Sequence, residues 1–497
     1  MSIFIFDSTP YFLQDSSTEY GISAQQIALF KSVPSAASVF IALLAGNLCS
    51  RYGTKRILAL GISFYIAAAF IIYLSASKLL LVVGLALFGV ACSVSTVCGY
   101  SILGDFDLNP SSITVLVSIW SFSGNLAYIS SPLLSTIILA NPSQSRETIS
   151  LMWMALISLA ALLLFMYRDK PIVLQGRVDY KLPILLGLFF TSIASLPILS
   201  EIYPALFESV LVICLGLLGL ILLMVAKAHE FRSQMKFLAN PAILLGLAAL
   251  GVNNFVDWNY LSERFLAIRF DLQLTEIAAW LTPSNLSGLL GASFFGFLGL
   301  RIGTRKATLT GLLGCLLISV FYILIDKSQS VAVIAIAIAI YVFFDNIVDA
   351  GIIAGITKYV PANLLGNLEA VNTITNSIAL CFGAEVSSRL FFRTFSLNLY
   401  KHLDHLPLDD EKTDLVADLI TQGRWSDVSR EEFGISVDHL RLFLTQSSLP
   451  SVQAVISAFH ILGWLCLVAI LATLFLYSLS FCLGSRTIAA PRIDKNI

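Results

Sequence analysis

Long apolar runs recur along the whole chain and predict membrane-spanning α-helices. A bilayer core of about 30 Å needs roughly 20 apolar residues per helix. Thirteen such windows lie near residues 27–48, 57–76, 79–103, 113–139, 148–167, 182–199, 205–226, 241–262, 277–299, 307–325, 330–355, 365–390 and 452–483. The segment SIFIFDSTPYFL at 2–13 is too short to cross. We interpret it as the outer half of a span that precedes the other thirteen and brings the total to fourteen.

The stretch AIAIAIAI at 335–342 alternates like a β-strand, but it lies in an apolar run too long for a strand. No series of short alternating segments surrounds it, as a membrane barrel would require. Composition also favours a membrane protein, since 57% of the residues are hydrophobic, 12% are charged and the mean hydropathy is +0.85. The predicted fold class is therefore an all-α integral membrane protein.

Charge and motif content exclude other classes. The net charge of −1, without long basic or acidic clusters, gives no indication of nucleic-acid binding. The sequence has no Walker A, HExxH, GxGxxG or GxSxG motif, so we expect neither an enzyme nor a cofactor. We expect a proton gradient to be the energy source. The eight cysteines form no CxxC pair, which predicts packing roles rather than a metal site. His402 and His405 are expected to be solvated.

Basic residues predict the orientation. With the N-terminus inside, the inner loops and the C-terminal tail hold Arg51, Lys55, Arg56, Arg168, Lys170, Arg177, Lys181, Lys227, Arg232, Lys236, Arg301, Arg305, Lys306, Lys358, Arg486, Arg492 and Lys495. Cytoplasmic loops carry the excess of Lys and Arg, so both termini are expected in the cytoplasm of a cell with this chain in its inner membrane. The long outer segment 394–450 is expected to be periplasmic and to form short amphipathic helices, with a capping box at Ser429 and Glu432.

A short basic turn motif occurs twice in the sequence. GNLCSRYGTKR at 46–56 and GFLGLRIGTRK at 296–306 stand 250 positions apart. Each follows a span that runs inward, and we interpret both as cytoplasmic gating loops. Their residues are Gly46, Arg51, Gly53, Lys55 and Arg56, and Gly296, Arg301, Gly303, Arg305 and Lys306. Alternatively, the basic residues of the two turns only set the orientation of the chain in the membrane.

Such a repeat indicates a transporter with two similar halves. We predict two pseudo-symmetric six-helix bundles, with an N-terminal half at 1–170 and a C-terminal half at 237–497. Two additional central helices are predicted at 171–236. No signal peptide is expected at the N-terminus.

The two turns resemble the loop signature of the major facilitator superfamily, G-x-L-x-D-R-x-G-R-R/K. Fourteen spans with a long last outer loop are similar to its drug:proton antiporter branch, and so is the first-span pattern Phe6-Asp7-Ser8-Thr9. The sequence also departs from the family. The loop Asp is replaced by Ser50 and Leu300, the fourth-span Arg by Leu85, and the fifth-span antiporter signature survives only as SPLLST around Pro132. These losses put the usual salt-bridge latch and antiport mechanism in question, but not the fold.

Ionisable groups in a membrane cost about 2.5 to 3.5 kcal/mol each on insertion scales, so we take them as functional candidates. The candidates for proton coupling or substrate binding are Asp7, Lys31, Asp257, Asp345, Asp349 and Glu369; the polar candidates for the cavity are Asn253, Asn254, Asn346, Asn372 and Asn376. Several are four apart and share a helix face, so we expect these stripes to converge on an internal cavity. A carboxyl group there can hold a proton and release it to water.

Simpler roles stay open for these residues. Asp7 and Lys31 can neutralise each other, Asp349 and Glu369 can be interfacial, and the asparagines can join helices by hydrogen bonds. Asp257 and Asp345 lie deeper, which favours function.

The sequence favours a proton-coupled exporter of an amphipathic organic compound or drug that works by alternating access. The alternatives are an uptake symporter for a small metabolite and a non-transporting scaffold or receptor with a transporter fold. The expected partners are membrane lipid and a small-molecule substrate. By analogy with the resembled branch, a periplasmic adaptor and an outer-membrane channel could dock at 394–450.

Overall fold

The computed structural model of the chain describes residues 24–75, 77–105, 109–139, 145–167, 180–202, 204–225, 235–256, 265–266, 269–270, 272, 274–326, 328–403 and 450–488. These residues form thirteen α-helices and three 3-10 helices, and no strand occurs among them. Seven of the α-helices are long and apolar enough to cross a membrane. The all-helical prediction is confirmed, also for the alternating stretch 335–342. The count of fourteen spans stays a prediction, because the first span lies outside the described residues.

The helices follow the predicted spans closely. The first five are α3 (Ala24–Tyr52), α4 (Thr54–Leu74), α5 (Lys78–Ile102), α6 (Pro110–Leu139) and α7 (Ser145–Met166), followed by α8 (Lys181–Ile202) and α9 (Pro204–Val225). The others are α11 (Pro241–Asn253), α13 (Leu274–Ile302), α14 (Thr304–Ile323), α15 (Val331–Thr357), α16 (Leu365–Leu403) and α20 (Pro450–Ile488). The 3-10 helices are η1 (Leu103–Asp105), η3 (Lys236–Ala239) and η4 (Ala362–Leu364).

Two boundaries differ from the expectation. Helix α16 continues to Leu403, so the first part of the predicted outer segment 394–450 is helical, and residues 404–449 lie outside the described part of the chain. Helix α11 ends at Asn253, well before the predicted end of its span at 262. Both differences concern helix ends, which apolar windows locate poorly.

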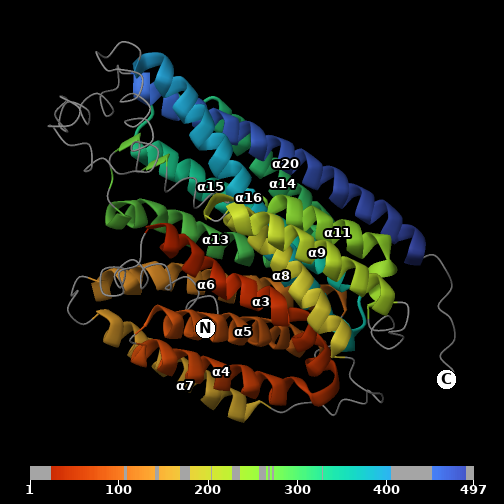
Figure 1. Cartoon of the computed structure of the whole chain (residues 1–497). Coiled ribbons are helices and arrows are strands. Elements are labelled where there is room, and N and C mark those ends of the chain that lie inside the picture. The colour runs from red at the N-terminus through yellow and green to blue at the C-terminus, as the bar shows by residue number, and fades with distance from the viewer. Residues whose placement is uncertain are drawn as a thin grey trace.

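The packing of the helices repeats along the chain. Helix α5 packs against α3 and α4, and α15 packs against α13 and α14 in the same way. Helix α6 packs against α13, and α16 packs against α3, which are the two pairs that an internal repeat would interchange. Figure 1 shows the N-terminal helices α3 to α7 on one side of the bundle and the C-terminal helices α14 to α16 and α20 on the other.

The central helices α8 and α9 lie beside this arrangement. Helix α8 packs against α3, α16 and α9, so it touches one N-terminal helix and one C-terminal helix. The yellow helices in Figure 1 lie across this boundary. The central pair therefore covers the contact between α3 and α16.

The repeated turns have the same backbone geometry. Gly53 has φ 92° and ψ 141°, and Gly303 has φ 86° and ψ 149°. Each glycine N–H donates to the carbonyl four residues earlier, that of Cys49 (3.2 Å) or Gly299 (3.1 Å). This region of φ and ψ is essentially open to glycine alone, so both copies need glycine to reverse the chain. We call the end of the bundle where these turns lie the turn end.

Corresponding basic residues of the two turns bind the last helix of their own half. Lys55 Nζ donates to the carbonyl of Tyr167, directly after α7, at 2.5 Å. Arg305, 250 positions later, lies over the ring of Phe481 on α20 at 4.0 Å. The basic side chain thus fastens each turn within its half, and the favourable end of the α7 dipole explains the choice of a cation for Lys55.

The first glycine of each turn lies where the two halves touch. A Cβ atom at Gly46 would lie 2.5 Å from Asn367 Oδ1 on α16, and one at Gly296 would lie 2.6 Å from Ser118 Oγ on α6. These are the two helix pairs that the repeat interchanges. Small residues let membrane helices approach closely, so the turn signature also encodes the contact between halves.

Large apolar side chains cover much of the outer surface. Leu79, Leu163, Val212, Leu317 and Phe475 are each at least 60% exposed. Exposed apolar surface on this scale suits contact with lipid rather than water.

Replacing either turn glycine should destabilise the fold. Gly53→Ala and Gly303→Ala force a side chain into a strained backbone region, at a cost of about 1–3 kcal/mol each. We expect a lower thermal unfolding midpoint of the detergent-purified protein for both variants.

Gly216→Ala is the matched control, because nothing lies within 4 Å of a Cβ atom built there. It lies inside α9, where alanine favours the helix by about 1 kcal/mol. If Gly53→Ala and Gly216→Ala had the same midpoint, the turn conformation would not matter to stability.

Candidate functional site

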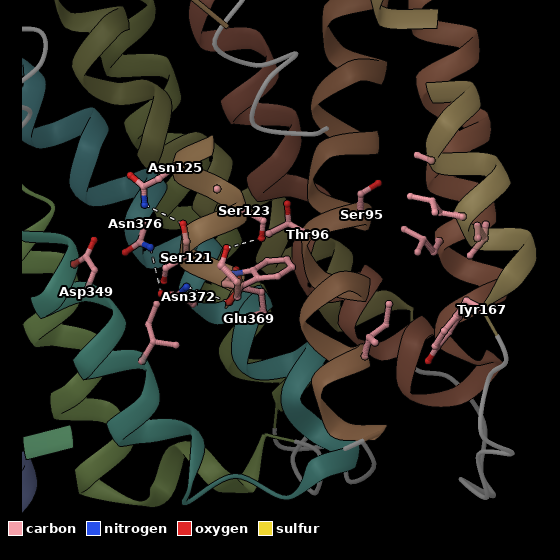
Figure 2. Close-up of a pocket in the computed structure, with 18 of the residues that line it drawn as sticks. Ser95, Thr96, Ser121, Ser123, Asn125, Tyr167, Asp349, Glu369, Asn372 and Asn376 are labelled. Carbon is pink, nitrogen blue, oxygen red and sulfur yellow. Dashed lines mark hydrogen bonds between the residues drawn. The ribbon is translucent and has the colours of Figure 1, made fainter. Parts of the chain in front are cut away.

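A cavity of about 570 Å³ lies between N-terminal and C-terminal helices. Figure 2 shows its lining, with α5 and α6 facing α15 and α16. Its polar lining residues are Ser95, Thr96, Ser121, Ser123, Asn125, Asn346, Asp349, Glu369, Asn372 and Asn376. Apolar residues such as Ile62, Leu164 and Ile353 line the rest. A cavity of this size and mixed lining suits a small organic molecule.

Two aspartates of α15, of which Asp349 lines the cavity, share one amide group. Asn253 Nδ2 donates to Asp345 Oδ1 at 2.7 Å and to Asp349 Oδ1 at 3.0 Å. The aspartates are four residues apart and therefore lie on one face of the helix. Asn253 is the last residue of α11 and is 5% exposed, so the shared amide is well shielded.

A second set of hydrogen bonds runs along α16. Asn254 Nδ2 donates to Asn376 Oδ1 (3.4 Å), and Asn376 Nδ2 donates to Asn372 Oδ1 (3.2 Å). Asn372 Nδ2 in turn donates to Glu369 Oε2 at 3.2 Å. Asn254 directly follows Asn253, the donor of the first set. The two sets therefore form one network of acids and amides, drawn in part in Figure 2.

A separate hydrogen bond in the cavity lining joins the C-terminal helices to the N-terminal helices. Asn125 Nδ2 on α6 donates to Asn346 Oδ1 on α15 at 2.7 Å. Asn346 Nδ2 is held by the carbonyl of Val342 in the previous turn of its own helix. Polar residues of the cavity lining thus join both halves of the repeat.

The cavity is acidic. Asp349 and Glu369 line it, and Asp345 lies one helical turn from Asp349. No Lys, Arg or His belongs to its lining in the part of the chain that the structure describes. Such a site can hold protons or a compound of positive charge, and it offers an anion no cationic partner among these residues.

Polar contacts join the two halves at the turn end. The hydroxyls of Tyr100 on α5 and Thr357 on α15 lie 2.7 Å apart, and the Trp120 ring packs edge-on against Tyr100 at 5.7 Å. Ser50 Oγ lies 2.9 Å from the carbonyl oxygen of Gly46 and 3.2 Å from that of Asn363, within η4. Ser50, which stands at the position of the family's loop Asp, thus contacts η4, directly before α16, through a neutral hydrogen bond.

The structure brings together most of the acids and amides that the sequence singled out. Asn253, Asn254, Asp345, Asp349, Glu369, Asn372 and Asn376 all belong to the network, and Asn346 lines the cavity beside it. Asp7 and Asp257 lie outside the described residues, as does the side chain of Lys31, so their expected roles stay predictions. The basic residues of the two turns are not part of the cavity lining.

Sequence reasoning missed the N-terminal side of the site. Asn125 and Ser121 lie four apart in an apolar run, the same spacing that marked the C-terminal stripes. No charged residue accompanies them on this face, so the cost of burying a charge does not single them out. Tyr100 and Thr357 carry no comparable signal, since their pairing depends on how α5 and α15 cross.

Removing the shared amide should destabilise the protein. Asn253→Leu keeps the branched shape of the side chain but leaves two carboxyl groups without their common donor, which costs about 1–3 kcal/mol. We expect a lower thermal unfolding midpoint in detergent, and partial recovery when Asp349→Asn is added.

Asn367→Leu serves as the control. Asn367 is fully buried on α16, and its amide finds no hydrogen-bond partner among the described residues. Its loss should therefore leave stability unchanged or higher. Equal losses in Asn253→Leu and Asn367→Leu, without recovery by Asp349→Asn, would argue against the network.

Comparisons with known proteins bear on the fold of the chain. In solved structures the chain is similar to the human organic anion transporter MFSD10 (TETRAN), with 11% identity, a TM-score of 0.59, and coverage of 95% of this chain and 97% of that one. It is also similar to a bacterial homologue of the iron transporter ferroportin in an outward-facing state, with 13% identity, a TM-score of 0.55, and coverage of 98% of this chain and 98% of that one. A third similar structure is the proton:xylose symporter XylE bound to 6-bromo-6-deoxy-D-glucose, with 14% identity, a TM-score of 0.54, and coverage of 89% of this chain and 96% of that one.

These identities are low, so the structural likeness shows the shared fold and no common substrate. No curated protein sequence matches the chain. The sequence model of the Major Facilitator Superfamily matches residues 1–384. That match covers most of the chain, which therefore belongs to the Major Facilitator Superfamily, a family of multi-pass membrane transporters.

Proposed function

We propose that the protein is a proton-coupled secondary transporter that exports an amphipathic organic compound across the cytoplasmic membrane. The observation that carries this proposal is the network of acids and amides beside a cavity between the two halves. A positively charged compound fits best, because the described lining offers carboxyl groups and no cation. We assign the chain to the drug:proton antiporter branch on its span count and motif remnants.

Exchange of charge explains the coupling. A carboxyl group at Asp349 or Glu369 that carries a proton leaves the cavity neutral, and so does a carboxylate paired with a cation. Proton and compound then compete for the same groups, so binding of one releases the other. Opposite fluxes follow when the cavity faces the two sides of the membrane in turn.

The turn end supplies the moving contact. Rocking of the halves must break the bonds of Tyr100 with Thr357 and of Ser50 with the backbone at Asn363. We place this end in the cytoplasm, following the distribution of basic residues. Both contacts are neutral hydrogen bonds, each worth about 0.5–1.5 kcal/mol net, so little energy resists the opening.

The sequence leaves two alternatives to proton-coupled export and suggests one docking partner. An uptake symporter would use the same network with parallel fluxes, and a scaffold would use it for structure alone. Docking of an adaptor at 394–450 has no support in the described residues, since 404–449 lie outside them.

Loss of a cavity carboxyl group should abolish coupling. In inside-out vesicles with an acidic lumen, addition of an amphipathic cation should release lumenal protons through the wild-type protein. Asp349→Asn and Glu369→Gln should slow this release by about tenfold or more, since a hydrogen bond to a charged group is worth about 1.5–3 kcal/mol.

Glu276→Gln is the control, because it removes an exposed acid from the first turn of α13, outside the cavity lining. Proton uptake into the lumen together with the compound would identify a symporter. Compound flux that all three variants leave unchanged would refute the coupling role of these acids.

Weakening the turn-end contact should favour opening. Spin labels at Arg56→Cys and Lys306→Cys, in a cysteine-free background, report the distance between the two repeated turns. Tyr100→Phe removes the bond to Thr357, so the ratio of long to short distances should rise about two- to tenfold.

Tyr73→Phe, near the opposite end of α4, should leave the distance distribution as in the parent. Identical distributions in the Tyr100→Phe variant and its parent would show that this contact does not hold the turn end closed.

A further inference from the structure

A second cavity, of about 560 Å³, lies on the other side of α16 from the polar network. Its walls come from α3, α8, α11, α16 and the 3-10 helix η3. On α16, Val371 and Thr375 face this cavity, whereas Asn372 and Asn376 face the first one. The second cavity is therefore a separate site, with α16 as the partition.

The lining of this cavity is apolar. Its members include Leu43, Phe190, Val252 and Ile378, and its single side-chain hydroxyl, that of Thr375, donates to the carbonyl of Val371 at 2.9 Å. Water held there would find almost no partner, and empty spaces of this size are rare in proteins. A hydrocarbon chain would satisfy the lining.

A positive charge stands at the turn-end edge of the cavity. Met235 and Leu238 line it, and the exposed Lys236 lies between them in the chain, at the start of η3. The adjoining end of α8 is at the turn end, since the hydroxyl of Tyr180 lies 3.0 Å from that of Tyr52. A lysine at the mouth of an apolar slot between membrane helices matches the phosphate of an anionic lipid.

We propose that this cavity holds an acyl chain of an anionic membrane phospholipid whose phosphate pairs with Lys236. The acyl chain would lie between α3 of one half and α11 and α16 of the other. Because α8 also walls the cavity, this central helix has a role in the site, namely closing a lipid slot at the boundary between halves. Lipid in the slot would therefore be displaced or compressed when the halves rock.

Photolabelling tests the site without any transport measurement. The full-length protein is placed in phosphatidylcholine vesicles with a small fraction of phosphatidylglycerol that carries a diazirine in one acyl chain, and labelled peptides are mapped by mass spectrometry. Label is expected on α8, α16 and η3. Ala248→Trp puts an indole into the cavity and should lower that label, whereas Leu317→Trp, on the exposed surface of α14, should not.

The head group is tested separately. Lys236→Gln should lower phosphatidylglycerol labelling of the slot about fivefold, the effect of one lysine near anionic lipid, and leave labelling by diazirine phosphatidylcholine unchanged. This variant changes only an exposed side chain, so it carries the test if Ala248→Trp fails to fold. Label spread evenly over the exposed helices would overturn the site. Equal phosphatidylglycerol labelling of Lys236→Gln and wild type would overturn the anionic head group.

Discussion

The shared hydrogen bonds from Asn253 to Asp345 and Asp349 are the interaction on which the rest of the site depends. Two carboxyl groups one helical turn apart within a membrane-spanning helix are costly unless donors or protons compensate them. The amide of Asn253 supplies a donor to both, and this requires the end of α11 to lie against the middle of α15. Asn254, the next residue, is then placed to continue the network toward α16.

The network also explains why the cavity lies between the halves. Its acids come from α15 and α16, and Asn125 on α6 lines the same cavity from the N-terminal side. A site built by only one half could not sense the position of the other. A site shared by both halves, with weak neutral contacts at the turn end, allows a ligand or a proton to bias the arrangement of the two halves.

The sequence predicted the helices, the repeated turn and the stripes of polar residues, because each of these is local. Glycine at 53 and 303 marks a backbone conformation that few other residues adopt, and spacing by four places Asp345 and Asp349 on one face. The sequence could not predict that Asn253 serves both aspartates, since 92 residues separate Asn253 from Asp345 and only the crossing of α11 and α15 joins them. The bonds of Asn125 and Tyr100 are long-range in the same sense.

The neutral Ser50 shows how a family motif changes without loss of its contact. The family's acidic latch is absent, yet the hydroxyl still reaches the backbone at Asn363. The spacing of glycines is kept in both copies, because it sets the turn and the approach of α3 to α16 and of α13 to α6. The backbone requirements of the repeat are thus met although the charged pair is gone.

Proton release on binding tests the central claim most directly, namely that compound and proton compete for the same buried acids. Purified protein in weakly buffered detergent would be titrated with an amphipathic cation while the pH of the solution is followed. The account predicts release of about one proton per compound bound, by linkage, and a smaller release in Asp345→Asn/Asp349→Asn. Tight binding without any release of protons would contradict it.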